Sequence, residues 1–115
     1  MPLKMTERMV GDVTVVDLEG RIVLGEESSA LRERVKGLLG QDRKQIILNM
    51  GQVSYIDSAG LGALVASYTS AKNQGAALKL VNLGQKFREV LQVTKLLTVF
   101  DVYDTEQAAI SSFPK

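Results

Sequence analysis

The sequence predicts an α/β protein with a mixed sheet of four to five strands and about four helices packed against it. After residue 25, short apolar runs alternate with segments whose apolar residues follow helical spacing, and this alternation is typical of α/β folds. The chain has 115 residues, of which 45% are hydrophobic, and this suffices for one packed core. We therefore expect a single domain over residues 1–115.

Two strands are expected near the N-terminus, at about Lys4–Met9 and Val13–Leu18, because Gly11-Asp12 between them is a turn signal. The apolar alternation of the second strand slips in phase, which indicates that both of its faces are partly buried. Gly20 is expected to end this strand, and residues 21–24 are compatible with a short third one.

A helix, a buried strand and a second helix are expected next. Ser28 or Ser29 can cap the first helix, and Gly40 is placed to end it. The run Ile46–Met50 is typical of a strand that is buried on both faces. The second helix is expected to end near Asn73.

The C-terminal part predicts two short strands and two helices. Ala77–Val81 is expected to form a strand, and Val99–Tyr103 a short edge strand. Between them, residues 83–91 show the apolar spacing of a helix. The pattern Asp104-x-x-Gln107 resembles a capping box, which predicts a short last helix.

The composition excludes several classes of function. The chain has no Cys, so it has neither disulfides nor thiolate chemistry, and it has no His, the commonest general base and metal ligand. Its net charge of +1 comes from 14 basic and 13 acidic residues that are scattered, which argues against direct nucleic-acid binding. No apolar run is long enough to span a bilayer and no signal peptide is visible, so we expect a cytoplasmic protein without direct membrane contact.

Ser58 is expected at a junction between a buried strand and a helix that carries Leu61, Leu64 and Val65 on its apolar positions. The first N–H groups of a helix lack partners within it, and the helix dipole is positive there, so such a site suits a phosphate. A simpler interpretation is that Ser58 only caps the helix and that two nearby glycines serve packing. Two glycines in a first turn weaken a helix by about 1 kcal/mol each, which favours a functional reason, such as a bare surface that a partner can approach.

The hexapeptide Asp57-Ser58-Ala59-Gly60-Leu61-Gly62 resembles the signature of the STAS domain, and specifically of the free-standing anti-sigma factor antagonists of bacteria. In that family an apolar strand and a short link precede this pattern, which opens a helix. The resemblance extends over nearly the whole chain, including the strand pair that ends at Gly20, the helix with Ala30-Leu31, and the strand Ala77–Val81 before a helix with Phe87. It implies a single STAS-type domain.

The resemblance further implies regulation by partner switching. The unphosphorylated antagonist would bind an anti-sigma factor that is also a serine kinase, and so free a sigma factor for transcription. The kinase would phosphorylate Ser58 with ATP and thereby release the antagonist, and a serine phosphatase would restore it. The protein would need no metal and no cofactor of its own. The expected partner-binding residues are Asp57, Ser58, Ala59, Gly60, Leu61, Gly62 and Glu26.

One position departs from the family pattern. Family members often carry an acidic residue shortly after the glycine that matches Gly20, and this chain has Val23 there. Glu26 or Glu27, in the loop that follows, is a possible substitute for that acidic group. The loop is expected near the Ser58 end of the sheet, so the departure bears on which partner is bound.

Two other classes of function remain open. A hydrolase with Ser58 as nucleophile would need a base, and without His only a Ser–Lys dyad remains, although no Lys is close to Ser58 in sequence. Alternatively, the chain is a STAS module of a stress-signalling assembly or of a membrane-transport complex. Nucleotide binding near Ser58 is a lesser variant.

Overall fold

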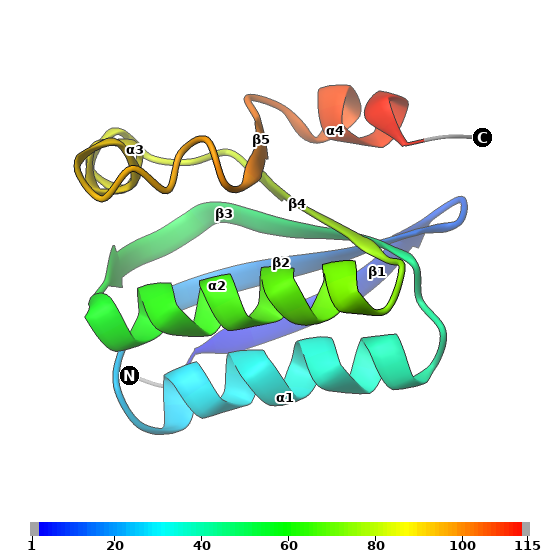
Figure 1. Ribbon diagram of the computed structural model, residues 1–115, viewed down its shortest axis with the longest axis horizontal. Helices are drawn as coiled ribbons and strands as arrows, with labels where there is room; N and C mark the ends of the chain where they lie inside the picture. The colour runs from blue at the N-terminus through cyan, green and yellow to red at the C-terminus, as the bar shows by residue number, and fades with distance from the viewer. Residues whose placement is uncertain (1–2, 114–115) are drawn as a thin grey trace.

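The computed structural model describes residues 3–113, and these form one five-stranded sheet with the strands in sequence order (Figure 1). β1 pairs with β2 in antiparallel fashion, and β2 to β5 are parallel to one another. The predicted mixed sheet is therefore confirmed, while residues 1, 2, 114 and 115 of the predicted domain range lie outside the described residues. The strands are β1 (Lys4–Val10), β2 (Val13–Ile22), β3 (Gln45–Ile56), β4 (Ala77–Val81) and β5 (Asp101–Tyr103).

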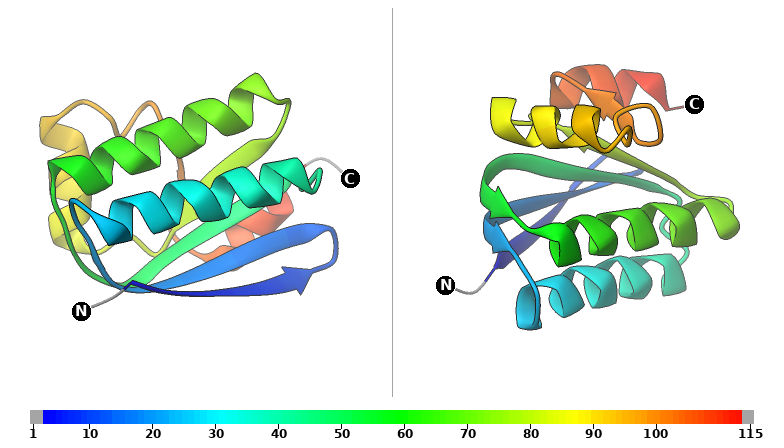
Figure 2. Two further views of the ribbon diagram at one scale, coloured as in Figure 1. Left: turned by 90° about the horizontal axis from the view of Figure 1, so that it is seen from below. Right: turned by 60° about the vertical axis from the view of Figure 1, so that its left-hand side comes forward.

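Four helices within the described range connect and cover these strands, as the sequence predicted. α1 and α2 lie side by side along one face of the sheet, and α4 packs against the opposite face (Figures 1 and 2). α3 contributes Leu91 to the same core cluster as α1 and α2. The helices are α1 (Glu26–Gly40), α2 (Ser58–Asn73), α3 (Gln85–Val93) and α4 (Glu106–Ser112).

The central strand β3 is buried on both faces over its first half, which confirms the prediction made from its apolar run. Ile46 and Leu48 belong to the large core cluster with α1 and α2, whereas Ile47 belongs to the smaller cluster under α4. Successive side chains of a strand point to opposite faces, so a layer of helices on each side requires this continuous apolar run. The second half of β3 pairs only with β2, because β4 is short.

β2 is longer than predicted. It continues through Gly20 to Ile22, so the expectations that Gly20 ends it and that residues 21–24 form a separate strand were wrong. Gly20 has a φ of 117°, a conformation that side-chain-bearing residues rarely adopt, and the pairing of β2 with β3 shifts register on both sides of it. The glycine thus permits an irregularity within the strand rather than its end, and β2 carries the chain as far as the N-terminus of α2.

Two helix caps also differ from the predictions. α1 begins at Glu26 after Gly25, and the Ser28 hydroxyl donates to the Val23 carbonyl at 2.6 Å instead of capping the helix. α4 is capped by Thr105, whose hydroxyl accepts from the Ala108 N–H at 3.1 Å, one residue later than the predicted Asp104. Both errors arise because capping depends on the direction of the chain entering the helix, which sequence spacing does not fix. The predicted end of α1 at Gly40 is confirmed.

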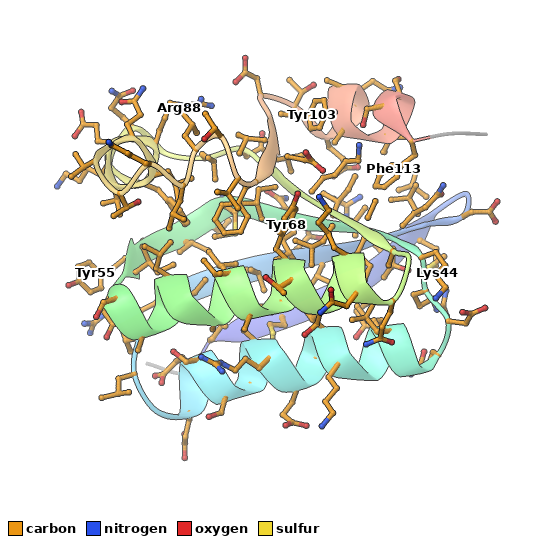
Figure 3. The ribbon with its side chains drawn as sticks, in the orientation of Figure 1. Lys44, Tyr55, Tyr68, Arg88, Tyr103 and Phe113 are labelled. Atoms are coloured by element: carbon orange, nitrogen blue, oxygen red, sulfur yellow. The ribbon has the colours of Figure 1, made fainter. Side chains whose placement is uncertain are left out.

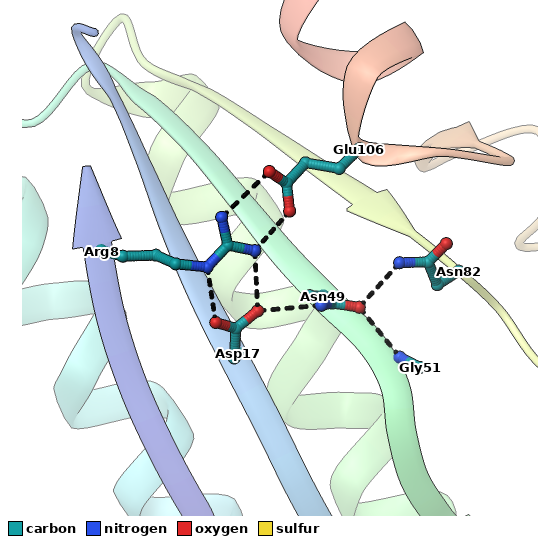
Figure 4. A network of polar contacts seen from close by, with 6 residues as sticks. All are labelled: Arg8, Asp17, Asn49, Gly51, Asn82 and Glu106. Carbon is teal, nitrogen blue, oxygen red and sulfur yellow. Dashed lines mark hydrogen bonds and ion pairs between the residues drawn. The ribbon is translucent and has the colours of Figure 1, made fainter. Parts of the chain in front are cut away.

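A polar network lies on the sheet face beside α4 (Figure 4). The Arg8 guanidinium pairs with Asp17 on β2 and with Glu106 at the start of α4. The hydrogen bonds that Arg8 donates hold the pKa of the Asp17 carboxyl below its ordinary value, although desolvation acts in the opposite direction. A hydrogen bond from Asn49 at 2.8 Å lowers this pKa further, by a smaller amount. Arg8 therefore connects the edge strand β1 to the last helix, which are distant in sequence.

We predict that Leu48→Ala lowers the free energy of unfolding by about 2–5 kcal/mol, because the Leu48 side chain is fully buried in the central strand and its removal leaves a cavity. Leu24→Ala makes the same chemical deletion at a side chain that is 77% exposed, and should change stability by no more than about 0.5 kcal/mol. Urea denaturation followed by circular dichroism measures both. Equal losses in the two variants would contradict the described core.

Candidate functional site

Ser58 is the first residue of α2, and its side chain is exposed. The cap of this helix is the preceding residue, Asp57, which has extended backbone angles and accepts a hydrogen bond from the Gly60 N–H at 2.8 Å. Ser58 itself makes no side-chain hydrogen bond to any residue between 3 and 113. The interpretation that Ser58 serves only as the cap is therefore wrong, and its hydroxyl is available to another molecule.

The Asp57 carboxylate joins two segments of the chain. One oxygen caps α2, and the other accepts from the Leu24 N–H, in the loop between β2 and α1, at 3.0 Å. The hydrogen bonds from these N–H groups hold the pKa of the Asp57 carboxyl below its ordinary value, and the bond from Gly60 has the larger effect. The Asp57 N–H also donates to the Ile22 carbonyl at 3.2 Å. The loop and the start of α2 therefore form one surface, with a negative charge next to Ser58.

The two glycines of the motif have different roles. Gly60 is buried, and a Cβ built on it would lie 2.0 Å from the Ile22 carbonyl oxygen, so no side chain fits there. The expectation that Gly60 keeps the surface open was wrong, because Gly60 instead allows α2 to start in direct contact with the end of β2. At Gly62 a Cβ would meet only the Arg32 guanidinium, at 3.9 Å, which is ordinary van der Waals contact.

The apolar residues of the motif anchor α2. Leu64 is fully buried, and Leu61 and Val65 are half-buried and pack against the same core cluster. Ala59 is half-buried next to the exposed serine. Of the six motif positions, Ser58 is thus the one whose side chain is exposed.

The loop between β2 and α1 adjoins the site, as the hydrogen bond from Leu24 to Asp57 shows. Glu26 is exposed at the start of α1, two residues after Leu24, which is compatible with the predicted role in partner contact. Val23 is half-buried, and its carbonyl accepts from both the hydroxyl and the N–H of Ser28. At the position where the family often has an acidic residue, this chain therefore presents a backbone contact that holds the loop to α1.

Sequence reasoning gave no role to two exposed apolar side chains at this end of the molecule. Leu24 is 77% exposed and Tyr55 is 53% exposed. Tyr55 lies at the same end of the molecule as the N-terminus of α2 (Figure 3), and the Arg21 guanidinium lies 5.3 Å from the centre of its ring. Tyrosine and arginine are enriched at the energetic centres of interfaces. In the sequence, the only indication of this surface was a tyrosine shortly before the motif, and the structure is needed to show that its ring is exposed.

Other kinds of site find little support in the part of the chain that is described. Among residues 3–113 no group of three or more acidic side chains is arranged to hold a metal ion. Of two grooves, one of about 420 Å³ lies between β1 and α1, and one of about 580 Å³ is lined mainly by the loops at the opposite end of the sheet. Neither includes residues 57–62. No helix among residues 3–113 is long and apolar enough to span a membrane.

The chain belongs to the STAS domain family, whose model matches residues 5–109. It is 35% identical to the anti-sigma-B factor antagonist of Bacillus subtilis over 72 residues, which cover 63% of this chain and 65% of that protein. A crystal structure of a candidate anti-sigma factor antagonist from Thermotoga maritima superposes with a TM-score of 0.86 and 26% identity, covering 93% of this chain and 92% of the other. The phosphorylated form of SpoIIAA, a cell-fate determinant from Bacillus, superposes with a TM-score of 0.71 and 23% identity, covering 94% and 97% of the two chains.

We predict opposite outcomes for the two glycines. Gly60→Ala should lower the free energy of unfolding by about 3 kcal/mol or more, because the new methyl group would collide with the Ile22 backbone, which cannot move without disturbing β2. Gly62→Ala, the matched control, should fold and gain up to about 1 kcal/mol, because alanine favours the helix. Urea denaturation measures both, and similar losses at the two positions would show that the close approach is not specific to Gly60.

We also predict a pH-dependent effect of Asp57→Asn. The pKa of Asp57 is lower in the folded protein than in the unfolded chain, so its carboxylate stabilises the fold above about pH 4, and this stabilisation disappears as the pH falls through the folded-state pKa. The variant should therefore melt below the wild type at pH 7, and the difference in Tm should shrink as the pH falls below about 4. Asn can still cap α2 with its one amide oxygen, so the variant loses the charge and one of the two acceptors.

Asp57→Ala is the control for that measurement. It removes the acceptor as well as the charge, so its deficit in Tm should persist at low pH, where protonated Asp57 can still accept hydrogen bonds. A difference in Tm between wild type and Asp57→Asn that does not shrink as the pH falls below about 4 would contradict the assigned role of the ionised carboxylate.

Proposed function

We propose that this protein is an anti-sigma factor antagonist that binds an anti-sigma factor while Ser58 is unmodified and dissociates when Ser58 is phosphorylated. One observation carries the proposal: the Ser58 hydroxyl is exposed at the start of α2 and makes no hydrogen bond within the described chain, because Asp57 caps the helix instead. A kinase can therefore modify Ser58 without breaking an interaction that the fold needs. The role that the relatives' names describe supports this assignment.

The expected effect of the phosphate is local. Phosphorylation adds a charge of about −1.5 to −2 at pH 7 beside a carboxylate that is already ionised. Within the folded protein the first turn of α2 tolerates an anion, since the helix dipole is positive there. A partner surface that packs against Ser58 and presents its own carboxylates or bound phosphates would instead repel the added charge. Affinity should fall while the fold changes little.

The partner system follows from the same proposal. The anti-sigma factor acts as a serine kinase with ATP as its phosphate donor, and a serine phosphatase regenerates the binding form. The antagonist itself acts as a cytoplasmic binding module, with no cofactor and no catalytic role, and controls sigma-factor-dependent transcription. Asp57, Ala59, Leu61, Gly62 and Glu26 frame the contact around Ser58, and Gly60 positions the backbone beneath it. SpoIIAA, which shares the fold, exists in a phosphorylated form.

We predict that Ser58→Glu abolishes capture of an ATP-binding anti-sigma kinase, whereas wild type and Ser58→Ala retain it, because only glutamate adds a charge at the contact. The measurement is affinity capture from the lysate of the native host, with bound proteins identified by mass spectrometry. Ser70→Glu is the matched control, since Ser70 is an exposed serine further along the same helix. This variant should retain the kinase.

Two results would overturn the assignment. Retention of the same membrane-transport or multi-subunit partners by wild type and Ser58→Glu would place the STAS domain in one of those assemblies instead. A large change in the circular dichroism spectrum of Ser58→Glu would show that the charge acts through the fold rather than at the contact surface.

A further inference from the structure

Arg32 on α1 has no partner of opposite charge in the described chain. Arg8, Arg34 and Arg88 each form a salt bridge, whereas no ion pair or hydrogen bond of the Arg32 side chain is found with residues 3–113. Arg32 is exposed, yet its guanidinium does not project away from the molecule. One of its terminal nitrogens lies 3.9 Å from the point where a Gly62 side chain would begin.

This position brings a cation close to Ser58. Ser58 and Gly62 are four residues apart in α2, so they share one face of the helix and are separated by about 6 Å along its axis. α1 and α2 lie side by side (Figures 1 and 2), and the guanidinium lies beside Gly62, at van der Waals distance from the position of a Cβ there. The Arg32 guanidinium therefore lies beside the helical turn that begins at Ser58, and Gly62 has no side chain to come between them.

We propose that Arg32 binds the phosphate of phosphorylated Ser58 within the same chain. This inference rests on the proposed phosphorylation of Ser58 and adds the group that receives the phosphate. A guanidinium is planar, permanently charged and suited to two parallel hydrogen bonds to phosphate oxygens. Rotation of a long, flexible side chain that gives up no ion pair suffices to form the contact.

The other charges around Ser58 make Arg32 the suitable counter-ion. Asp57 adjoins the serine, and Glu26 is exposed at the start of α1, so both would repel a phosphate. Arg21 on β2 is the alternative cation, but its guanidinium lies over the ring of Tyr55, 5.3 Å from the ring centre. The contact with Arg32 would lower the free energy of the phosphorylated protein and so prolong the released state.

The test uses phosphoserine introduced at position 58 during translation, so that it requires no kinase and no partner. The second ionisation of the phosphate is followed by ³¹P NMR across pH 5–8. A nearby cation favours the doubly charged phosphate and lowers its pKa. Arg32→Gln should therefore raise the pKa of the phosphate by roughly 0.5 unit relative to the otherwise wild-type protein, an effect of the size expected for an exposed pair. Arg32→Lys keeps a positive charge, so its phosphate pKa should lie between those of the wild-type and Arg32→Gln proteins.

Arg21→Gln is the matched control and should leave the pKa of the phosphate unchanged. Equal pKa values in wild type and Arg32→Gln, or an equal rise in Arg21→Gln, would overturn the assignment of Arg32. Matching circular dichroism spectra and Tm values of the unphosphorylated variants exclude a loss of fold as the cause. Because no partner is present, failure here would leave partner switching at Ser58 standing, and failure of partner switching would leave this measurement unaffected.

Discussion

The Asp57 carboxylate is the interaction on which the site depends. Its two oxygens accept from the Gly60 and Leu24 N–H groups, so one side chain both starts α2 and holds the loop before α1 against it. Each of these donors would otherwise lack a partner at the end of a secondary-structure element. Because the carboxylate accepts from both N–H groups, the neighbouring Ser58 hydroxyl has no structural role to fill. The fold and the proposed chemistry are thus divided between two adjacent residues.

The close approach of Gly60 to the Ile22 carbonyl fixes where that carboxylate lies. The end of β2, the end of β3 and the start of α2 meet within a space that admits no Cβ. β2 reaches this point because Gly20 permits an irregularity that keeps the strand paired with β3 beyond the shift in register. The serine is therefore presented from a rigid junction rather than from a flexible loop. Such rigid presentation suits the proposed recognition of Ser58 by a kinase and by a binding partner.

The surface around Ser58 combines exposed apolar side chains with charges of both signs. Leu24 and Tyr55 offer apolar area to a partner. Asp57 directly precedes the serine, and Arg32 of α1 lies beside Gly62, one turn further along α2. Added phosphate changes the electrostatic balance of this surface without requiring any element of the sheet to move. In the proposed function, regulation is therefore a change in surface charge on an unchanged scaffold.

The sequence by itself determined the order of elements, the burial of β3 on both faces and the position of Ser58 before α2, because apolar periodicity and the Asp57–Gly62 motif are local properties. It did not determine the end of β2, the caps of α1 and α4, or the different roles of Gly60 and Gly62. Those depend on what the fold brings opposite each residue: the Ile22 carbonyl against Gly60, and Arg32 against Gly62. Spacing along the chain does not encode such contacts between distant segments, so only the tertiary structure decided them.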